Sequence, residues 1–269
     1  MNKTIWEECK KKWQWVLDCV YNKGCDASDI KISPPLSISN VIQFEKETGL
    51  MLPEDYKEMI LNYSSSIEFY WFLFKREGEM FDQNDPVFKF RLARFKESLP
   101  EEEFERVKEK LIFELRKKRE KIDIPDEIKI SSGGTGSGSL AQEDNETILE
   151  SYINFQNIIK ASKPYIKGYN DEIYKYFYVI MWQSDGDYII MDLKDTPTRI
   201  LYLDHEFNYG PEGMVQIGTG FTDFLIRFSN LGCPGPDIYT LKKFLDPKRN
   251  ILDDKCDLAK KWISWLNQK

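Results

Sequence analysis

The chain has 269 residues, of which 41% are hydrophobic and 14% aromatic, so it has enough apolar side chains for a packed core and too many for a disordered chain. Its formal net charge of −7 argues against general nucleic-acid binding, which needs a basic surface. No run approaches the roughly 20 apolar residues of a membrane-spanning helix, and residues 1–12 lack the apolar stretch of a secretory signal. These observations predict a cytoplasmic protein.

The five cysteines are scattered along the chain, and their number is odd: Cys9, Cys19, Cys25, Cys233 and Cys256. None forms a C-x-x-C pair, so the sequence indicates neither a disulfide framework nor a zinc site. We interpret them as reduced thiols that pack as small hydrophobic residues.

The first quarter of the chain predicts three helices and a strand. Apolar residues recur at helical spacing over residues 4–23. Asn40 and Gln43 resemble a capping box that opens a second helix, which Gly49 ends. Pro53 suits the first turn of a third, and the aromatic run Ile67–Phe74 is typical of a buried strand.

The middle of the chain differs in composition. Residues 76–130 form a charged insert that contains a predicted helix over 100–120, which either docks on the core or binds a partner. Ser131–Ser139 has the glycine and serine content of a flexible linker. Its spacing matches neither G-x-G-x-x-G nor G-x-x-x-x-G-K-[ST], so a phosphate-binding loop is not favoured.

The remainder predicts strands between flanking helices. Helices are expected over 141–162, 221–228 and 255–267, and strands over Ile173–Trp182, Tyr188–Leu193, Arg199–Leu203 and Met214–Ile217. This order indicates one α+β domain over 1–269, with a twisted antiparallel sheet packed against helices on one face. Trp182, Tyr188, Ile190, Phe221 and Phe224 are predicted core residues, and Ile190 should share a face with Tyr188.

Acidic residues are concentrated in one stretch. Residues 170–225 contain ten acids and three bases, so this stretch accounts for the entire net charge. Such a stretch sets the electrostatic preference of a protein for its partners. The predicted partner-binding residues are those placed mostly in turns, where a charge stays hydrated: Asp171, Glu172, Asp185, Asp187, Asp195, Glu206 and Glu212. The alternative is a solubilising face without a partner.

Asp192 is a weaker candidate for that surface. It lies near the end of a predicted strand, where we expect it to hydrogen-bond locally and fix the turn to Lys194.

Catalytic and metal sites are less well supported. His205 is the only histidine, and no G-x-S-x-G or comparable nucleophile motif accompanies it. Asp185 and Asp187 have D-x-D spacing, but the rest of a calcium-binding loop is missing. Asp187 and Asp192 should face opposite sides of their strand. We therefore expect no catalytic residue, no metal and no cofactor.

Four segments in a fixed order resemble the SUKH superfamily, which includes a yeast regulator of cell-wall assembly and many bacterial immunity proteins. They are Ile42-x-Phe44-Glu45-x3-Gly49-x2-Leu52-Pro53-x2-Tyr56-Lys57, Asp185-Gly186-Asp187-Tyr188-Ile189-x2-Asp192-Leu193, Leu203-x-His205-Glu206 and Phe221-Thr222-Asp223-Phe224-Leu225. The resemblance covers about residues 38–74 and 165–230. The short Asn-Gly turn of the family is replaced by Asn62-Tyr63-Ser64.

The resemblance implies an α+β domain without catalytic residues. Many bacterial members are implied to bind and neutralise a toxin, and other members act as regulatory scaffolds. The leading hypothesis is therefore an immunity-type protein that binds a basic toxin domain, since an acidic inhibitor complements a surface that binds phosphates. A regulatory adaptor is the alternative. An enzyme centred on His205 or on Asp185 and Asp187 is the third hypothesis.

Overall fold

The computed structural model describes residues 1–75, 148–166, 169–182, 186–207, 209–234 and 238–268, with a few isolated residues between 96 and 137. Almost all of the predicted charged insert over 76–130, with its helix, lies outside these residues. So do most of the Gly-Ser segment, the first part of the predicted helix over 141–162, and the side chain of Trp182.

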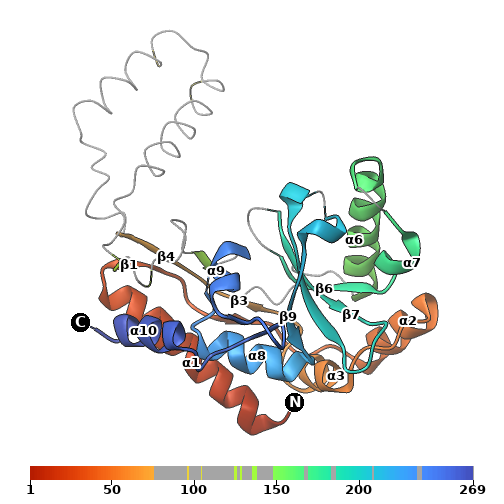
Figure 1. The fold of residues 1–269 in the computed structure, drawn as a ribbon. Helices are drawn as coiled ribbons and strands as arrows, with labels where there is room; N and C mark the ends of the chain where they lie inside the picture. The colour runs from red at the N-terminus through yellow and green to blue at the C-terminus, as the bar shows by residue number, and fades with distance from the viewer. Residues whose placement is uncertain are drawn as a thin grey trace.

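The three predicted helices and the predicted strand follow one another before the insert as expected (Figure 1). Two short strands that were not predicted follow the first helix, and the predicted strand Ile67–Phe74 is divided at Phe69. Helix α1 presents one apolar stripe to the interior, including Trp6, Trp13 and Val20. The elements are α1 (Lys3–Asn22), β1 (Cys25–Ala27), β2 (Lys31–Ile32), α2 (Ile38–Thr48), α3 (Glu54–Asn62), β3 (Ile67–Glu68) and β4 (Tyr70–Lys75).

Two local details differ from the sequence-based expectations. Helix α2 begins after Ser37, without a side-chain capping bond, so the capping box at Asn40 was wrong, while Gly49 ends the helix in the left-handed conformation as predicted. Within the Gly-Ser segment, Thr135–Ser137 form strand β5, which pairs with β4. This strand was not predicted, because strand pairing uses the backbone and needs no apolar side chain. The flexibility of the segment over Ser131–Ser139 stays a prediction, since most of it lies outside the described residues.

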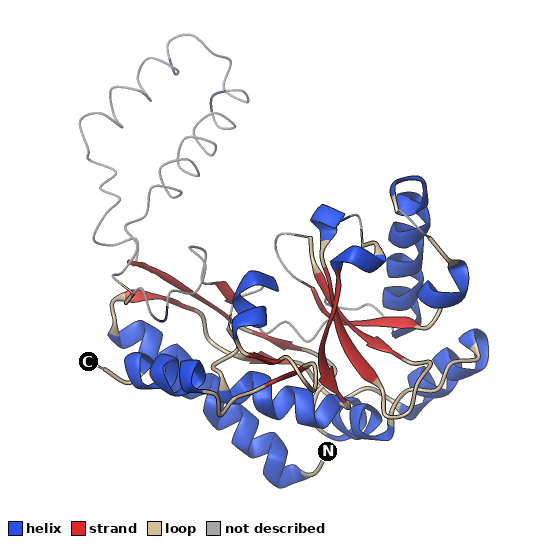
Figure 2. Cartoon of the chain, viewed as in Figure 1, coloured by secondary structure: helices blue, strands red, loops and turns tan. Residues whose placement is uncertain are grey.

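A four-stranded antiparallel sheet forms the centre of the second half (Figure 2). Its strands follow one another in chain order: β6 (Phe177–Trp182), β7 (Tyr188–Asp192), β8 (Arg199–Leu203) and β9 (Met214–Thr219). The predicted strand from Ile173 begins four residues later, because Asp171–Tyr174 form helix α7. The α+β class is confirmed, with helices packed against an antiparallel sheet.

Both faces of this sheet are buried, although the sequence predicted helices on only one face. All five residues of β7 are buried. Ile189 and Met191 belong to the main core, which contains Phe44 and Phe224. On the other face lies a smaller second core, formed by Tyr188, Ile190 and eight further residues: Phe155, Ile159, Ile166, Tyr174, Phe177, Val179, Leu201 and Leu203. Ile190 and Tyr188 thus share a face, as predicted.

Helix α6 (Ile148–Ser162) contributes Phe155 and Ile159 to the second core, and Ile166, just after the short 3-10 helix Lys163–Tyr165, also belongs to it. Helix α8 (Phe221–Asn230) covers the opposite face. In Figure 1, α6 and α7 lie on one side of the sheet and α8 on the other. The chain ends with α9 (Ile238–Lys243), the hairpin of β10 (Leu245–Asp246) and β11 (Ile251–Leu252), and α10 (Asp257–Leu266).

Indole nitrogens join the terminal helices to the last turn of α8 and to the residue that follows it. Trp13 donates from Nε1 to Ser229 Oγ at 2.9 Å, and Trp262 donates to the Leu231 carbonyl at 2.9 Å. These buried hydrogen bonds give the large apolar rings a fixed orientation, because a buried indole N–H needs an acceptor.

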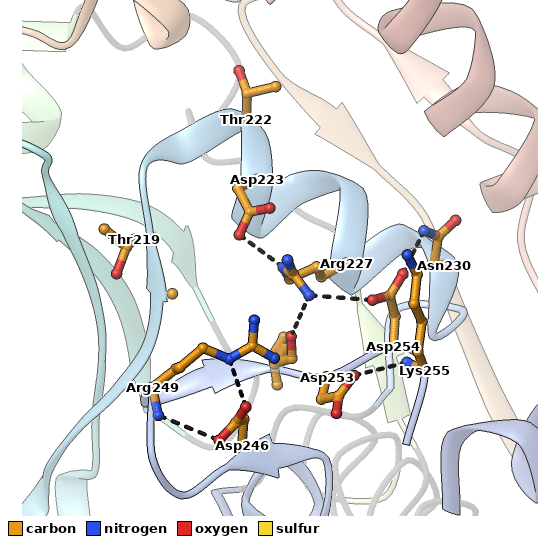
Figure 3. A network of polar contacts seen from close by, with 12 residues as sticks. Thr219, Thr222, Asp223, Arg227, Asn230, Asp246, Arg249, Asp253, Asp254 and Lys255 are labelled. Atoms are coloured by element: carbon orange, nitrogen blue, oxygen red, sulfur yellow. Dashed lines mark hydrogen bonds and ion pairs between the residues drawn. The ribbon is translucent and has the colours of Figure 1, made fainter. Parts of the chain in front are cut away.

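Arg227 fastens the C-terminal hairpin to α8 (Figure 3). Its Nε donates to Asp223 at 2.7 Å, and its Nη1 donates to Asp254 and to the Leu252 carbonyl, each at 3.3 Å. Asn230 Nδ2 adds a bond of 2.7 Å to Asp254. These contacts join α8 to Leu252 of β11 and to Asp254 just after it, so they position the C-terminal region.

All five cysteines are free thiols. Cys9, Cys25 and Cys233 are buried, as their interpretation as packing residues requires. Burial raises the pKa of the Cys9 thiol to about 11, which keeps it protonated at neutral pH. No helix within the described residues is both long and apolar enough to cross a membrane.

Replacing Gly218 with alanine is expected to destabilise the protein. A Cβ atom there would lie 3.0 Å from Phe224 Cβ and 3.3 Å from Ile200 Cβ. Overpacking of this kind costs about 1–3 kcal/mol, which a urea unfolding curve of Gly218→Ala would measure. An unchanged unfolding midpoint would mean that α8 moves away from β9 at little cost.

Candidate functional site

Four of the seven predicted partner-binding residues lie exposed on two neighbouring segments. Asp171 and Glu172 begin α7, and the other two occupy short 3-10 helices after β8: Glu206 in His205–Phe207 and Glu212 in Pro211–Gly213. The Tyr174 hydroxyl donates to the Tyr209 carbonyl at 2.9 Å and so joins the two segments. The structure therefore brings these four acids to one region.

The charges of Asp171 and Glu172 are partly balanced by lysines. Asp171 accepts a hydrogen bond of 2.7 Å from the Tyr169 hydroxyl and forms an ion pair of 3.2 Å with Lys163. These two contacts hold the pKa of Asp171 below its usual value. Glu172 pairs with Lys175. The acids of α7 therefore add less to the local field than their number suggests.

The described residues of the connection between β8 and β9, 204–207 and 209–213, which we call the β8–β9 loop, are held by backbone hydrogen bonds. Asp204 N donates to the Gly213 carbonyl at 3.2 Å and closes the base of the loop. Tyr209, with φ of 59°, donates from its backbone N to the Asp204 carbonyl at 3.1 Å. Gly210 N donates to the Phe207 carbonyl at 2.9 Å. The loop is therefore compact and internally bonded.

Asp187 supports this loop from beneath and does not belong to the exposed surface. Its side chain is 6% exposed and accepts hydrogen bonds from the Tyr202 hydroxyl and from His205, by the backbone N at 2.7 Å and by Nδ1 at 2.6 Å. Its inclusion among the exposed acids was thus wrong. The donors lie 15 and 18 residues along the chain, and only the fold brings them to the carboxylate.

Asp187, Asp204 and His205 place one potential metal-ligand atom each within 4.8 Å of one another. However, both carboxylate oxygens of Asp187 already accept hydrogen bonds from protein donors. Asp204 Oδ1 accepts another from Glu206 N at 2.8 Å. A cation bound through His205 Nδ1 would have to displace the bond from that atom to Asp187, so the arrangement fits a set of hydrogen bonds that supports the loop better than a metal centre.

Asp195 lies at the other end of the sheet. It is exposed in the turn between β7 and β8 and forms an ion pair of 3.2 Å with Arg199. β8 is five residues long, so this turn lies roughly 17 Å from the β8–β9 loop along the strand. Asp195 therefore does not join the same surface, and Asp185 lies outside the described residues.

Asp192 behaves as predicted for a residue that fixes its turn. Its side chain is 2% exposed, accepts a hydrogen bond of 3.1 Å from Lys194 N, and forms an ion pair with Arg199. The local hydrogen bond that we expected of Asp192 is confirmed.

Exposed apolar side chains accompany the acids. Phe207 lies directly after Glu206 and is 46% exposed, and Ile173 on α7 is 37% exposed. Sequence reasoning missed Phe207 because it weighed charges and ignored the aromatic residue between Glu206 and the turn at Gly210-Pro211. An apolar side chain in a short polar loop between strands was the available signal.

No family model matches the chain, and neither curated proteins nor solved structures give a significant match to it. The geometry of the β8–β9 loop and its surroundings therefore has to support any functional proposal.

Proposed function

We propose that this chain is an immunity-type protein of the SUKH kind, which binds a basic toxin domain and neutralises it by direct, partly electrostatic contact. The observation that carries this proposal is the convergence of Asp171, Glu172, Glu206 and Glu212 on two bonded segments around exposed apolar side chains. The sequence resemblance described above adds support.

The physical basis is electrostatic steering. Acidic side chains on a fixed loop raise the rate at which a basic surface approaches in the correct orientation, and they disfavour acidic competitors. Asp171 and Glu172 contribute less under this proposal than their exposure suggests, because both have lysine partners. The apolar side chains among the four acids supply contact area that water would otherwise cover.

One contact favours a second candidate function. The bond between His205 Nδ1 and buried Asp187 is the arrangement by which a carboxylate orients a general-base histidine. A hydrolytic enzyme would also need a nucleophile, for which the sequence has no motif. If His205→Ala abolished a turnover while partner binding stayed intact, the enzyme would displace our proposal.

Reversing two charges tests the proposed function. The double variant Glu206→Lys, Glu212→Lys should bind its partner about tenfold more slowly at low salt, the partner under this proposal being a basic toxin domain encoded by a neighbouring gene. The difference should shrink towards physiological ionic strength, where the screening length is about 8 Å. Stopped-flow association at several salt concentrations measures both effects. Co-expression of toxin and wild-type chain should restore growth of the producing cells.

Asp257→Lys is the matched control. Asp257 has a side chain that is 92% exposed at the start of α10, and in Figure 1 this helix lies on the other side of the molecule from the β8–β9 loop. The control should leave association unchanged at every salt concentration. The double variant changes the net charge by +4 and the control by +2, so slowing by the control of about half the logarithmic size would show that net charge alone matters. Absence of binding by the wild-type chain would refute the proposal.

A further inference from the structure

We propose that Phe207 is the anchor of the interface: its ring enters an apolar pocket of the partner protein whose rim carries cationic side chains. This inference rests on the proposed function and names the partner chemistry that the same surface fits. The evidence for it is the geometry of the β8–β9 loop. The acidic residues are used only to infer the charge around the partner's pocket.

The first step is the exposure of Phe207. Nearly half of this residue faces solvent, although the chain places the equally large Phe221, Phe224 and Phe228 in the core. A solvated aromatic ring loses the roughly 25 cal/mol per Å² that burial provides. Aromatic side chains are enriched in the buried centres of protein interfaces, where a partner supplies that burial.

The second step is that the backbone carrying Phe207 is fixed before any partner arrives. His205 N is bonded to Asp187 at 2.7 Å, Glu206 N to Asp204 Oδ1 at 2.8 Å, and the Phe207 carbonyl accepts from Gly210 N at 2.9 Å. Three consecutive residues are thus tied to buried or internal groups. Binding through such a loop loses little conformational entropy, so more of the contact energy appears as affinity.

The third step is the close contact between the Phe207 side chain and Gly213. A Cβ atom built on Gly213 would lie 2.8 Å from Phe207 Cβ and 3.2 Å from the Asp204 carbonyl oxygen. Only glycine leaves room for the stem of Phe207 at this position. Gly213→Ala therefore displaces the Phe207 side chain without removing it, and it tests position separately from chemistry.

The fourth step defines the partner. Glu206 precedes Phe207 directly, and Glu212 is exposed five positions further along the same loop. A pocket that receives the ring would bring its rim against these carboxylates, so arginine or lysine side chains fit there. An anionic lipid surface fits poorly, because it repels the same carboxylates. The favoured occupant is accordingly a protein with an apolar pocket and a basic rim.

The test compares single variants by surface plasmon resonance against the toxin domain encoded beside this gene. Phe207→Ala should increase the dissociation rate about 30-fold or more, which is the effect of losing an interface anchor. Its association rate should change less than about threefold, since the charges remain. Gly213→Ala should increase the dissociation rate to a smaller extent. Tyr239→Ala is the control, because Tyr239 on α9 is 57% exposed and should have no effect.

The outcomes separate the anchor from the function on which it rests. If the wild-type chain binds the toxin domain and folded Phe207→Ala dissociates at the wild-type rate, the anchor is refuted while the immunity function stands. If the wild-type chain does not bind the toxin domain, both fail. If the wild-type chain binds vesicles of phosphatidylserine and phosphatidylcholine and Phe207→Ala does not, Phe207 binds a lipid surface. The proposed pocket in a partner protein is then refuted.

Discussion

Replacing Phe224 with alanine is expected to lower the free energy of unfolding by about 3–5 kcal/mol. The ring is fully buried between α8 and the sheet and stacks on Phe228 with ring centres 5.4 Å apart. The Cβ atom of residue 224, which alanine keeps, already lies close to the backbone of Gly218. Helix α8 therefore has little room to move towards β9 and fill the space that the ring leaves. The cavity should therefore persist, which places the cost at the upper end of the range for large-to-small substitutions. Guanidinium unfolding monitored by circular dichroism measures it.

Phe207→Ala is the matched control for this measurement. It removes the same number of atoms from a ring that is 46% exposed, so it should cost less than about 1 kcal/mol. Similar losses for both variants would show that α8 is peripheral to the core or that the β8–β9 loop contributes more to stability than its exposure indicates.

Removal of the Asp187 carboxylate should produce the second large effect. Asp187→Ala leaves the Tyr202 hydroxyl and two donors of His205 without their acceptor. A buried donor without a partner costs about 1–3 kcal/mol, and the loss of a charged acceptor from several donors predicts a total of about 3 kcal/mol in thermal or chemical unfolding. Amide hydrogen exchange in the β8–β9 loop should also become faster, because the bond to His205 N is lost.

Asp195→Ala provides the comparison, because this exposed residue forms a surface ion pair with Arg199 and should cost less than about 1 kcal/mol. A stable Asp187→Ala variant with unchanged exchange in the loop would mean that water replaces the carboxylate. The proposed fixed presentation of Phe207 would then lose its structural basis.

Much of the sheet could be predicted because its strands carry their own signals. β8 occupies Arg199–Leu203 as predicted, since a short apolar run that includes Ile200 and Tyr202 lies between polar turns. The burial of both faces of the sheet could also have been predicted from the sequence. The uninterrupted apolar run of β7 is typical of a strand covered on both sides, and we interpreted it too cautiously.

The site was harder to predict because it depends on contacts that are distant in the sequence. The excess of acids in residues 170–225 predicted where charge accumulates, yet not that Asp195 and Glu206 lie at opposite ends of β8. The burial of Asp187 follows from hydrogen bonds to residues 15 and 18 positions away. Local spacing carries no information about such contacts until the register of β7 and β8 is known.

The sheet also acts as a partition between two interiors that can change independently. Tyr174 lies in the second core and Tyr209 packs against it, so α7 and the β8–β9 loop rest on this smaller interior. The terminal helices α1 and α10 belong to the main core on the opposite side. Two substitutions that share no contacting residues tend to have additive effects on the free energy of unfolding. Selection for binding to a changing partner could therefore alter residues of the second core and of the β8–β9 loop. The main core, on which folding depends most, could stay unchanged.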